Sequence, residues 1–155
     1  MTTSQLLFSF SGRLNRKPYW LTVLVLILIT IVAVALILGI AGAGILSGDM
    51  SGLGMALALA AIAYIPLLWI GLALGAKRLH DRNKSAWWLL VFYLLPGILQ
   101  GLGERAGDLG IVLTIAGFAI SIWALVELGF LRGTVGPNQY GPDPLEAPGY
   151  APAPR

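Results

Sequence analysis

Residues 19–41 have the sequence YWLTVLVLILITIVAVALILGIA, which contains no charged residue. The uncharged stretch extends beyond this segment and runs from residue 18 to residue 48. An α-helix needs about 20 apolar residues to cross the ~30 Å hydrocarbon core of a bilayer. Residues 19–41 therefore predict a transmembrane helix. The alternative is a cleaved signal peptide, but the apolar run of such a peptide spans only about 7–15 residues.

Three further apolar segments predict the rest of the fold. We expect helices at about residues 53–75, 87–102 and 109–131; the middle one is the weakest because it is short and contains Pro96. The predicted fold class is all-α, an integral membrane bundle of four transmembrane helices within residues 19–132. Residues 1–18 would form an interfacial N-terminal arm on the cytoplasmic side. Residues 133–155 would form a cytoplasmic, proline-rich tail that is disordered beyond Asp143.

The composition of the 155-residue chain agrees with a membrane protein. Hydrophobic residues make up 57% and charged residues 11%, against about 25% charged residues in soluble domains. The absence of cysteine excludes disulfides, thiolate metal sites and cysteine nucleophiles. We expect no cofactor, and no metal site either, because the single histidine cannot build one without further ligands.

The basic residues predict the orientation in the membrane. Nine of the ten lie on one side of the predicted helices, and only Arg105 lies on the other. The positive-inside rule then places both termini in the cytoplasm. Because the basic residues stay at the membrane edges and form no stripe with interleaved aromatic residues, nucleic-acid binding is not expected. The nine are Arg13, Arg16, Lys17, Lys77, Arg78, Arg82, Lys84, Arg132 and Arg155.

Three polar motifs occupy that same side of the predicted helices. They are Gly12-Arg13-x-x-Arg16-x-x-Tyr19-Trp20; Arg78-Leu79-His80-Asp81 followed by Ser85-x-Trp87-Trp88; and Gly133-x-x-Gly136-Pro137-Asn138-x-Tyr140-Gly141-Pro142-Asp143-Pro144. In this order, with helices between them, the motifs resemble the YhaH-type family of small bacterial inner-membrane proteins, a family of unknown function. The resemblance covers residues 8–144. It implies a multi-pass protein of the bacterial cytoplasmic (inner) membrane, and it supplies no activity or catalytic residues. Lys77 and Ala86 depart from the family pattern, which has arginine and glycine there.

We expect the three motifs to converge on the cytoplasmic face as a basic and aromatic rim. If the second helix continues through this motif, Asp81 pairs with one arginine. Two interpretations remain open: the rim only anchors the topology and caps helices, or it binds anionic lipid or a protein partner. The candidate site residues are Arg13, Arg16, Arg78, His80, Asp81, Arg82, Trp87, Trp88 and Asn138.

The neighbours His80 and Asp81 invite a general-base mechanism. Adjacent residues on a helix point about 100° apart, so Asp81 is a poor orienting partner for the imidazole. No nucleophile can be assigned from spacing either. A non-enzymatic protein is therefore the first hypothesis and a membrane-lipid enzyme the third.

Glu127 is the one ionisable residue inside a predicted span. Such residues are costly in a bilayer and are functional candidates by default. Because Glu127 lies near the cytoplasmic end of its helix, we expect an ion pair with Arg13, Arg16 or Arg78. The alternative is a proton or cation relay in a small transporter or channel, which is the second hypothesis for function.

The motif Gly71-x-x-x-Gly75 lies on the second predicted helix. Small residues at this spacing let helices approach closely, so it favours packing within the bundle. Dimerisation through these glycines is the alternative. The expected partners are membrane lipids, with a protein partner or a second copy of the chain as alternatives.

Overall fold

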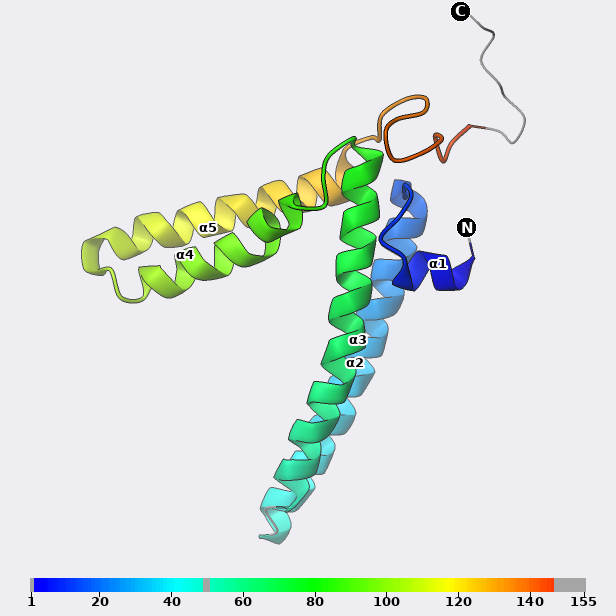
Figure 1. Ribbon diagram of the computed structural model, residues 1–155. Helices are drawn as coiled ribbons and strands as arrows, with labels where there is room; N and C mark the ends of the chain where they lie inside the picture. The colour runs from blue at the N-terminus through cyan, green and yellow to red at the C-terminus, as the bar shows by residue number, and fades with distance from the viewer. Residues whose placement is uncertain (1, 49–50, 147–155) are drawn as a thin grey trace, which may run out of the picture.

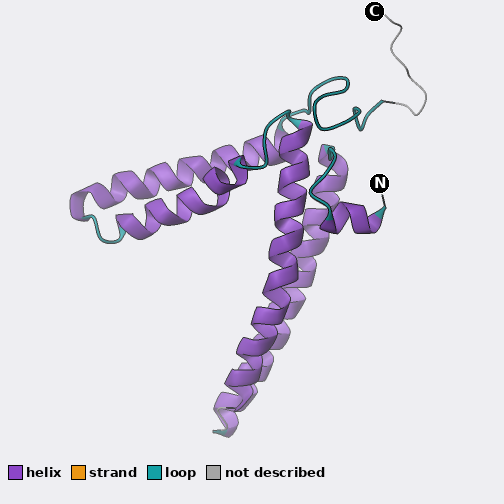
Figure 2. Ribbon diagram, in the orientation of Figure 1, coloured by secondary structure: helices purple, strands orange, loops and turns teal. Residues whose placement is uncertain are grey.

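The computed structural model describes residues 2–48 and 51–146. The described part is helical, and no strand occurs in it (Figure 2). The expected disorder beyond Asp143 concerns mainly residues 147–155, which lie outside the described residues.

The first helical hairpin is formed by α2 (Arg16–Ser47) and α3 (Ser51–Asp81). Asn15 caps the start of α2 by accepting a hydrogen bond from the Arg16 amide at 2.6 Å. At the other end, Gly48 adopts the left-handed conformation with φ 72°, which an L-residue with a side chain rarely adopts. Both helices extend well beyond the predicted bounds, because helix propagation does not stop where the hydrocarbon core does.

The second hairpin is formed by two less regular arms. The first arm contains the π-helix η1 (Leu90–Leu94) and α4 (Leu95–Gly103). A short 3₁₀ turn, η2 (Gly107–Leu109), leads into α5 (Gly110–Leu125), which ends in the π-helix η3 (Val126–Phe130). Pro96 has no backbone N–H, and the hydrogen-bond pattern changes from π to α just before it.

The two hairpins share one end of the molecule and diverge from it, so they do not form a parallel bundle (Figure 1). Three helical segments in the described part are long and apolar enough to span a membrane: Arg16–Ser47, Ser51–Asp81 and Gly107–Phe130. The predicted span at residues 87–102 corresponds to the shorter apolar segment Leu90–Gly103.

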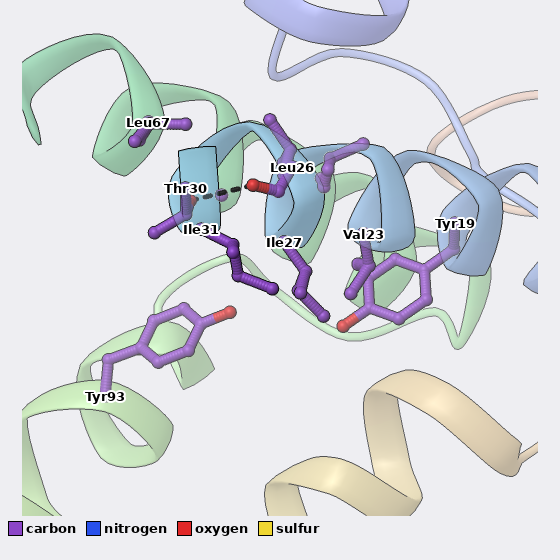
Figure 3. Close-up of a pocket in the computed structure, with 10 residues that line it drawn as sticks. Tyr19, Val23, Leu26, Ile27, Thr30, Ile31, Leu67 and Tyr93 are labelled. Atoms are coloured by element: carbon purple, nitrogen blue, oxygen red, sulfur yellow. Dashed lines mark hydrogen bonds between the residues drawn. The ribbon is translucent and has the colours of Figure 1, made fainter. Parts of the chain in front are cut away.

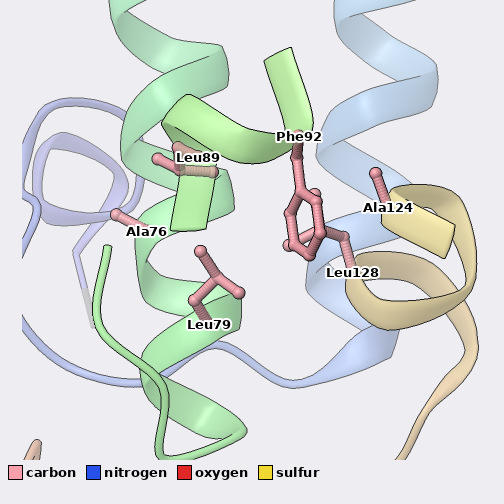
Figure 4. Packing of buried hydrophobic residues seen from close by; sticks show 6 residues of the cluster. All are labelled: Ala76, Leu79, Leu89, Phe92, Ala124 and Leu128. Atoms are coloured by element: carbon pink, nitrogen blue, oxygen red, sulfur yellow. The ribbon is translucent and has the colours of Figure 1, made fainter. Parts of the chain in front are cut away.

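The hydrophobic core lies where the hairpins meet. Leu79 of α3, Leu89, Phe92 of η1 and Leu128 of η3 are buried there together (Figure 4). Away from this core the helices expose many large apolar side chains, as expected for segments apolar enough to span a membrane. We call this shared end, residues 9–18, 77–88 and 127–145, the charged end. The short helix α1 (Thr3–Phe8) packs against α3 near it (Figure 1).

Candidate functional site

A buried ion-pair network forms the centre of the charged end. Because α3 continues through Asp81, the Arg78 guanidinium reaches Oδ2 of that carboxylate, with Nη1 at 2.6 Å. Arg13 approaches from the first motif and places Nε 3.1 Å from Oδ1. The side chains of Arg13, Arg78 and Asp81 are 1%, 0% and 4% exposed. The predicted pairing of Asp81 with one arginine is thus found, and a second arginine shares the carboxylate.

Arg13 also holds the segment that follows η3. Its Nη1 donates to the Gly136 carbonyl at 2.7 Å, and its Nη2 donates to the Thr134 carbonyl at 2.6 Å. Asp143 supplies a second carboxylate 4.0 Å from Nη2. We call residues 133–145 the C-terminal strap. The two arginines are therefore balanced by two carboxylates, one from α3 and one from the strap.

The C-terminal end of η3 is capped by side chains from α2, from α3 and from Arg82, which follows α3. A helix end leaves its last carbonyl groups without intrahelical donors, and these need partners when buried. Every carbonyl from residue 128 to residue 132 accepts a hydrogen bond from a side chain. The donors, in order, are Arg78 to Leu128 at 2.7 Å, Trp20 to Gly129 at 2.9 Å, Arg16 to Phe130 at 3.0 Å, Arg78 to Leu131, and Arg82 to Arg132 at 2.6 Å.

Sequence reasoning missed this main-chain role of the basic residues. It assigned the arginines to ligands or to acidic side chains, whereas most of their acceptors are carbonyl oxygens of residues 128–141. One signal was present in the sequence: an apolar helix that ends at a cluster of glycines exposes carbonyl groups that no local side chain can cap.

The expected partners of Glu127 are wrong. Glu127 is 4% exposed and pairs with Arg82 at 3.0 Å and Lys84 at 2.8 Å, not with Arg13, Arg16 or Arg78. The reason is the turn that ends α3. Asn83, with φ 57°, occupies the left-handed position of a Schellman motif, closed by a 2.8 Å bond from the Lys84 amide to the Leu79 carbonyl. This turn brings Lys84 back beside η3.

The side chain of His80 contacts different residues from those that contact Asp81. Its ring stacks on Tyr140 of the strap, with centroids 3.9 Å apart and planes 7° from parallel. Its Nδ1 lies 3.3 Å from the Gly12 carbonyl. Asn138 donates to the main-chain carbonyl of His80 at 2.9 Å. Since the Asp81 carboxylate is occupied by two arginines, it does not orient the imidazole as a general base would require.

Comparison with known proteins supports the relationship suggested by the three motifs. Residues 7–142 match the family model described as "Protein of unknown function (DUF805)". The chain belongs to the DUF805 family. It is 33% identical over 144 residues to the Inner membrane protein YhaH of Escherichia coli (strain K12), covering 90% of this chain and 89% of that protein. It is 32% identical over 150 residues to the Uncharacterized protein YiiR of the same strain, covering 92% and 90%. No solved structure matches.

The two tryptophans of the central motif have different environments in this DUF805 chain. Trp88 packs edge-on against Trp123 with centroids 5.4 Å apart, and the Lys84 ammonium lies 5.4 Å from its ring centre. Trp87 is 75% exposed. Trp88 therefore joins the two arms of the second hairpin, whereas Trp87 is free to meet the headgroup layer, where indole rings are favoured.

Lys77, one of the two departures from the family pattern, anchors the N-terminal arm. Its side chain is fully buried and donates to the carbonyls of Gln5, at 2.9 Å, and Leu6. Sequence reasoning did not assign this role. An ammonium group can serve two carbonyls at the end of a short helix, because it is a compact donor with three hydrogens.

A groove beside the N-terminal turn of α2 is lined by two exposed basic residues of the charged end. It has a volume of about 710 Å³ and lies between α2, η3 and the strap. Its lining includes the basic residues Arg16 and Lys17 together with the apolar surfaces of Trp20, Leu21 and Phe130. Both basic residues are exposed. Neither forms an ion pair with a carboxylate within the described part of the chain.

Acidification is expected to release the strap of this DUF805 chain. Hydrogen bonds from the Leu145 and Gly136 amides and the charge of Arg13 lower the pKa of Asp143, with the Leu145 bond the largest contribution. A carboxylate with a lowered pKa stabilises the folded state above its unfolded pKa of about 3.9, and this contribution is lost as the pH falls through the folded pKa.

The measurement is an NMR titration of the Gly136 and Leu145 amides in detergent micelles. We expect both resonances to shift together with a midpoint below pH ~3.9. In Asp143→Asn the shift should disappear. A midpoint at or above ~3.9 would contradict the arrangement described here.

Proposed function

We propose that this DUF805 protein is a multi-pass inner-membrane protein with its charged end in the cytoplasm. The name of its relative YhaH supports the location, and the three membrane-length helices support integration into the bilayer. The η1–α4 arm returns alongside α5 in the second hairpin, which supports four passes with both termini inside (Figure 1). The basic residues favour the same orientation, since only Arg105 lies at the opposite turn.

We further propose that the charged end binds an anionic phospholipid headgroup in the groove beside α2. The observation that carries this proposal is the contrast between two groups of basic residues. Arg13 and Arg78 are buried, and their donors are filled by carboxylates and carbonyl groups. Arg16 and Lys17 are exposed beside an apolar wall. An anionic headgroup with an acyl chain matches this combination of charge and apolar surface.

The geometry of Glu127 favours a structural ion pair over transport. Two cations hold its carboxylate at 3.0 and 2.8 Å, which stabilises the charged form and opposes proton exchange. The contacts of His80 and Asp81 likewise give no support to an enzyme, because each is held by separate partners. A non-enzymatic lipid-binding role is the function that these contacts support best.

Replacing Arg16 and Lys17 together by glutamine is expected to weaken anionic lipid binding. Each basic residue near an anionic surface contributes about 1 kcal/mol, so the double variant should bind roughly tenfold to thirtyfold more weakly. The measurement is native mass spectrometry of the full chain released from vesicles of phosphatidylglycerol and phosphatidylethanolamine. We expect phosphatidylglycerol adducts on the wild type and few on the double variant.

Arg105→Gln is the matched control, because Arg105 is an exposed basic residue at the opposite end. It should keep the wild-type adducts. Wild-type levels of phosphatidylglycerol on the double variant would rule out this groove. Capture of a protein instead of lipid would favour the partner hypothesis.

A further inference from the structure

A second hollow lies on another face of α2, inside the angle between the two hairpins. It has a volume of about 300 Å³. Its walls come from α2, α3 and η1, and they are apolar apart from Tyr19, Tyr93 and Thr30. The Thr30 hydroxyl donates to the Leu26 carbonyl of its own helix at 2.7 Å and is therefore satisfied. The polar groups available in this cavity are thus the two phenols.

The two phenol hydroxyls point toward one another across the cavity (Figure 3). Neither has a hydrogen-bond partner among the described residues. A hydroxyl group transferred from water to hydrocarbon without a partner loses several kcal/mol, so unpaired phenols at this place call for an acceptor. The acceptor must be a polar group of a lipid molecule, because the hydrocarbon chains of the bilayer offer no hydrogen-bond acceptor.

The depth of the cavity indicates which acceptor the bilayer supplies. Tyr19 follows Arg16, the first residue of α2, by three positions, which corresponds to a rise of about 4.5 Å. The polar interface of a bilayer is about 5–8 Å thick on each side of the hydrocarbon core, and tyrosine is enriched there. At the inner edge of this layer lie the ester carbonyl groups that join glycerol to the acyl chains.

We propose that this cavity holds one glycerophospholipid, whose ester carbonyl accepts hydrogen bonds from Tyr19 and Tyr93 and whose acyl chain fills the angle between the hairpins. Gly71 leaves open space in the wall, with no atom within 4 Å of a Cβ built there. At its neighbour in the motif, Gly75, a built Cβ would lie 2.8 Å from a Leu89 methyl carbon and 3.4 Å from the Tyr93 hydroxyl. The lipid would complete the packing that the diverging hairpins lack. The site does not use Arg16 or Lys17, so it is independent of the headgroup groove.

The test compares two zwitterionic lipids that differ only in the linkage to glycerol. A diacyl phosphatidylcholine has ester carbonyl groups, whereas the dialkyl ether analogue of equal chain length has none. We expect the diacyl lipid to raise the melting temperature of the detergent-purified full chain more than the ether lipid does. The difference should vanish in the double variant Tyr19→Phe, Tyr93→Phe. Because both lipids carry no net charge, the outcome does not depend on the proposed anionic groove.

Matched variants keep the test decisive. Tyr64 is an exposed tyrosine of α3 outside the cavity, so Tyr64→Phe should retain the wild-type difference between lipids. Gly71→Leu should fill the cavity and abolish the difference while leaving both phenols in place. Gly39→Leu, at a glycine of α2 with open space around it, should retain it. Equal stabilisation of the wild type by the two lipids, or a difference that survives in both the double variant and Gly71→Leu, overturns the proposal.

Discussion

Replacing Arg78 by leucine is expected to lower the free energy of unfolding by about 3–5 kcal/mol, the usual effect of removing one partner of a buried charge pair. Arg78 is fully buried and bonds to Asp81 and to the carbonyls of Leu128 and Leu131. Leucine removes these donors and leaves Asp81 with Arg13 alone, and each buried group that becomes unsatisfied adds its own desolvation cost. Arg78→Lys should recover only part of the loss, since an ammonium group lacks the planar fork that serves several acceptors.

The measurement is thermal unfolding of the purified chain in detergent, followed by tryptophan fluorescence. Arg105→Leu is the control, because Arg105 is exposed and forms no ion pair in the described part of the chain. It should change the melting temperature little. If Arg78→Leu were as stable as Arg105→Leu, the network would not hold the two hairpins together.

Gly133→Ala is expected to be the most damaging addition of a single methyl group. A Cβ at Gly133 would overlap the Asp81 carboxylate, which is fixed between Arg13 and Arg78. Overpacking of a rigid interior costs about 1–3 kcal/mol, and displacement of a shared carboxylate weakens two buried ion pairs in addition. We expect a lowered melting temperature, together with faster proteolysis of the strap.

Gly97→Ala is the matched control for this change. Gly97 lies within α4 and has no atom within 4 Å of a Cβ built on it. Alanine in a helix interior is favoured over glycine by about 0.5–1 kcal/mol, so this variant should be unchanged or slightly more stable. An unaffected strap in Gly133→Ala would mean that Asp81 can move without loss, and that its ion pairs contribute little.

The buried arginines change how the basic residues of the rim are interpreted. At the level of sequence, nine basic residues on one side of a membrane protein serve as topology signals and candidate anion ligands. In the folded chain, Arg78 and Arg82 cap the end of η3, and Arg13 holds the strap. Variants of these residues are therefore expected to act first on stability. Arg16 also donates to the Phe130 carbonyl, but it is exposed and forms no ion pair among the described residues, so variants of Arg16 and Lys17 are expected to affect the fold less.

Predictions from the sequence were most successful for helices whose formation depends on one continuous segment of the chain. The apolar run at residues 19–41 lies entirely within α2, and the segment at 53–75 lies entirely within α3. Helix formation in an apolar solvent is enforced by backbone hydrogen bonding within the segment, so hydropathy alone predicts it. The segment at 87–102 corresponds to Leu90–Gly103, and what the sequence did not predict there is the π-helical turn at Leu90–Leu94.

The sequence by itself determined the all-helical membrane character, the three polar motifs and the family to which they belong. The tertiary structure decided the partner of each charged side chain. Glu127 pairs with Arg82 and Lys84 because the turn at Asn83 returns the chain to η3. Arg13 bonds to the Gly136 and Thr134 carbonyls of the strap, at 2.7 and 2.6 Å, because the segment before α2 and the strap meet at the shared end of the hairpins. Periodicity and charge act along one segment, whereas the choice of partner depends on which faces of different helices meet, and that is a property of the whole fold.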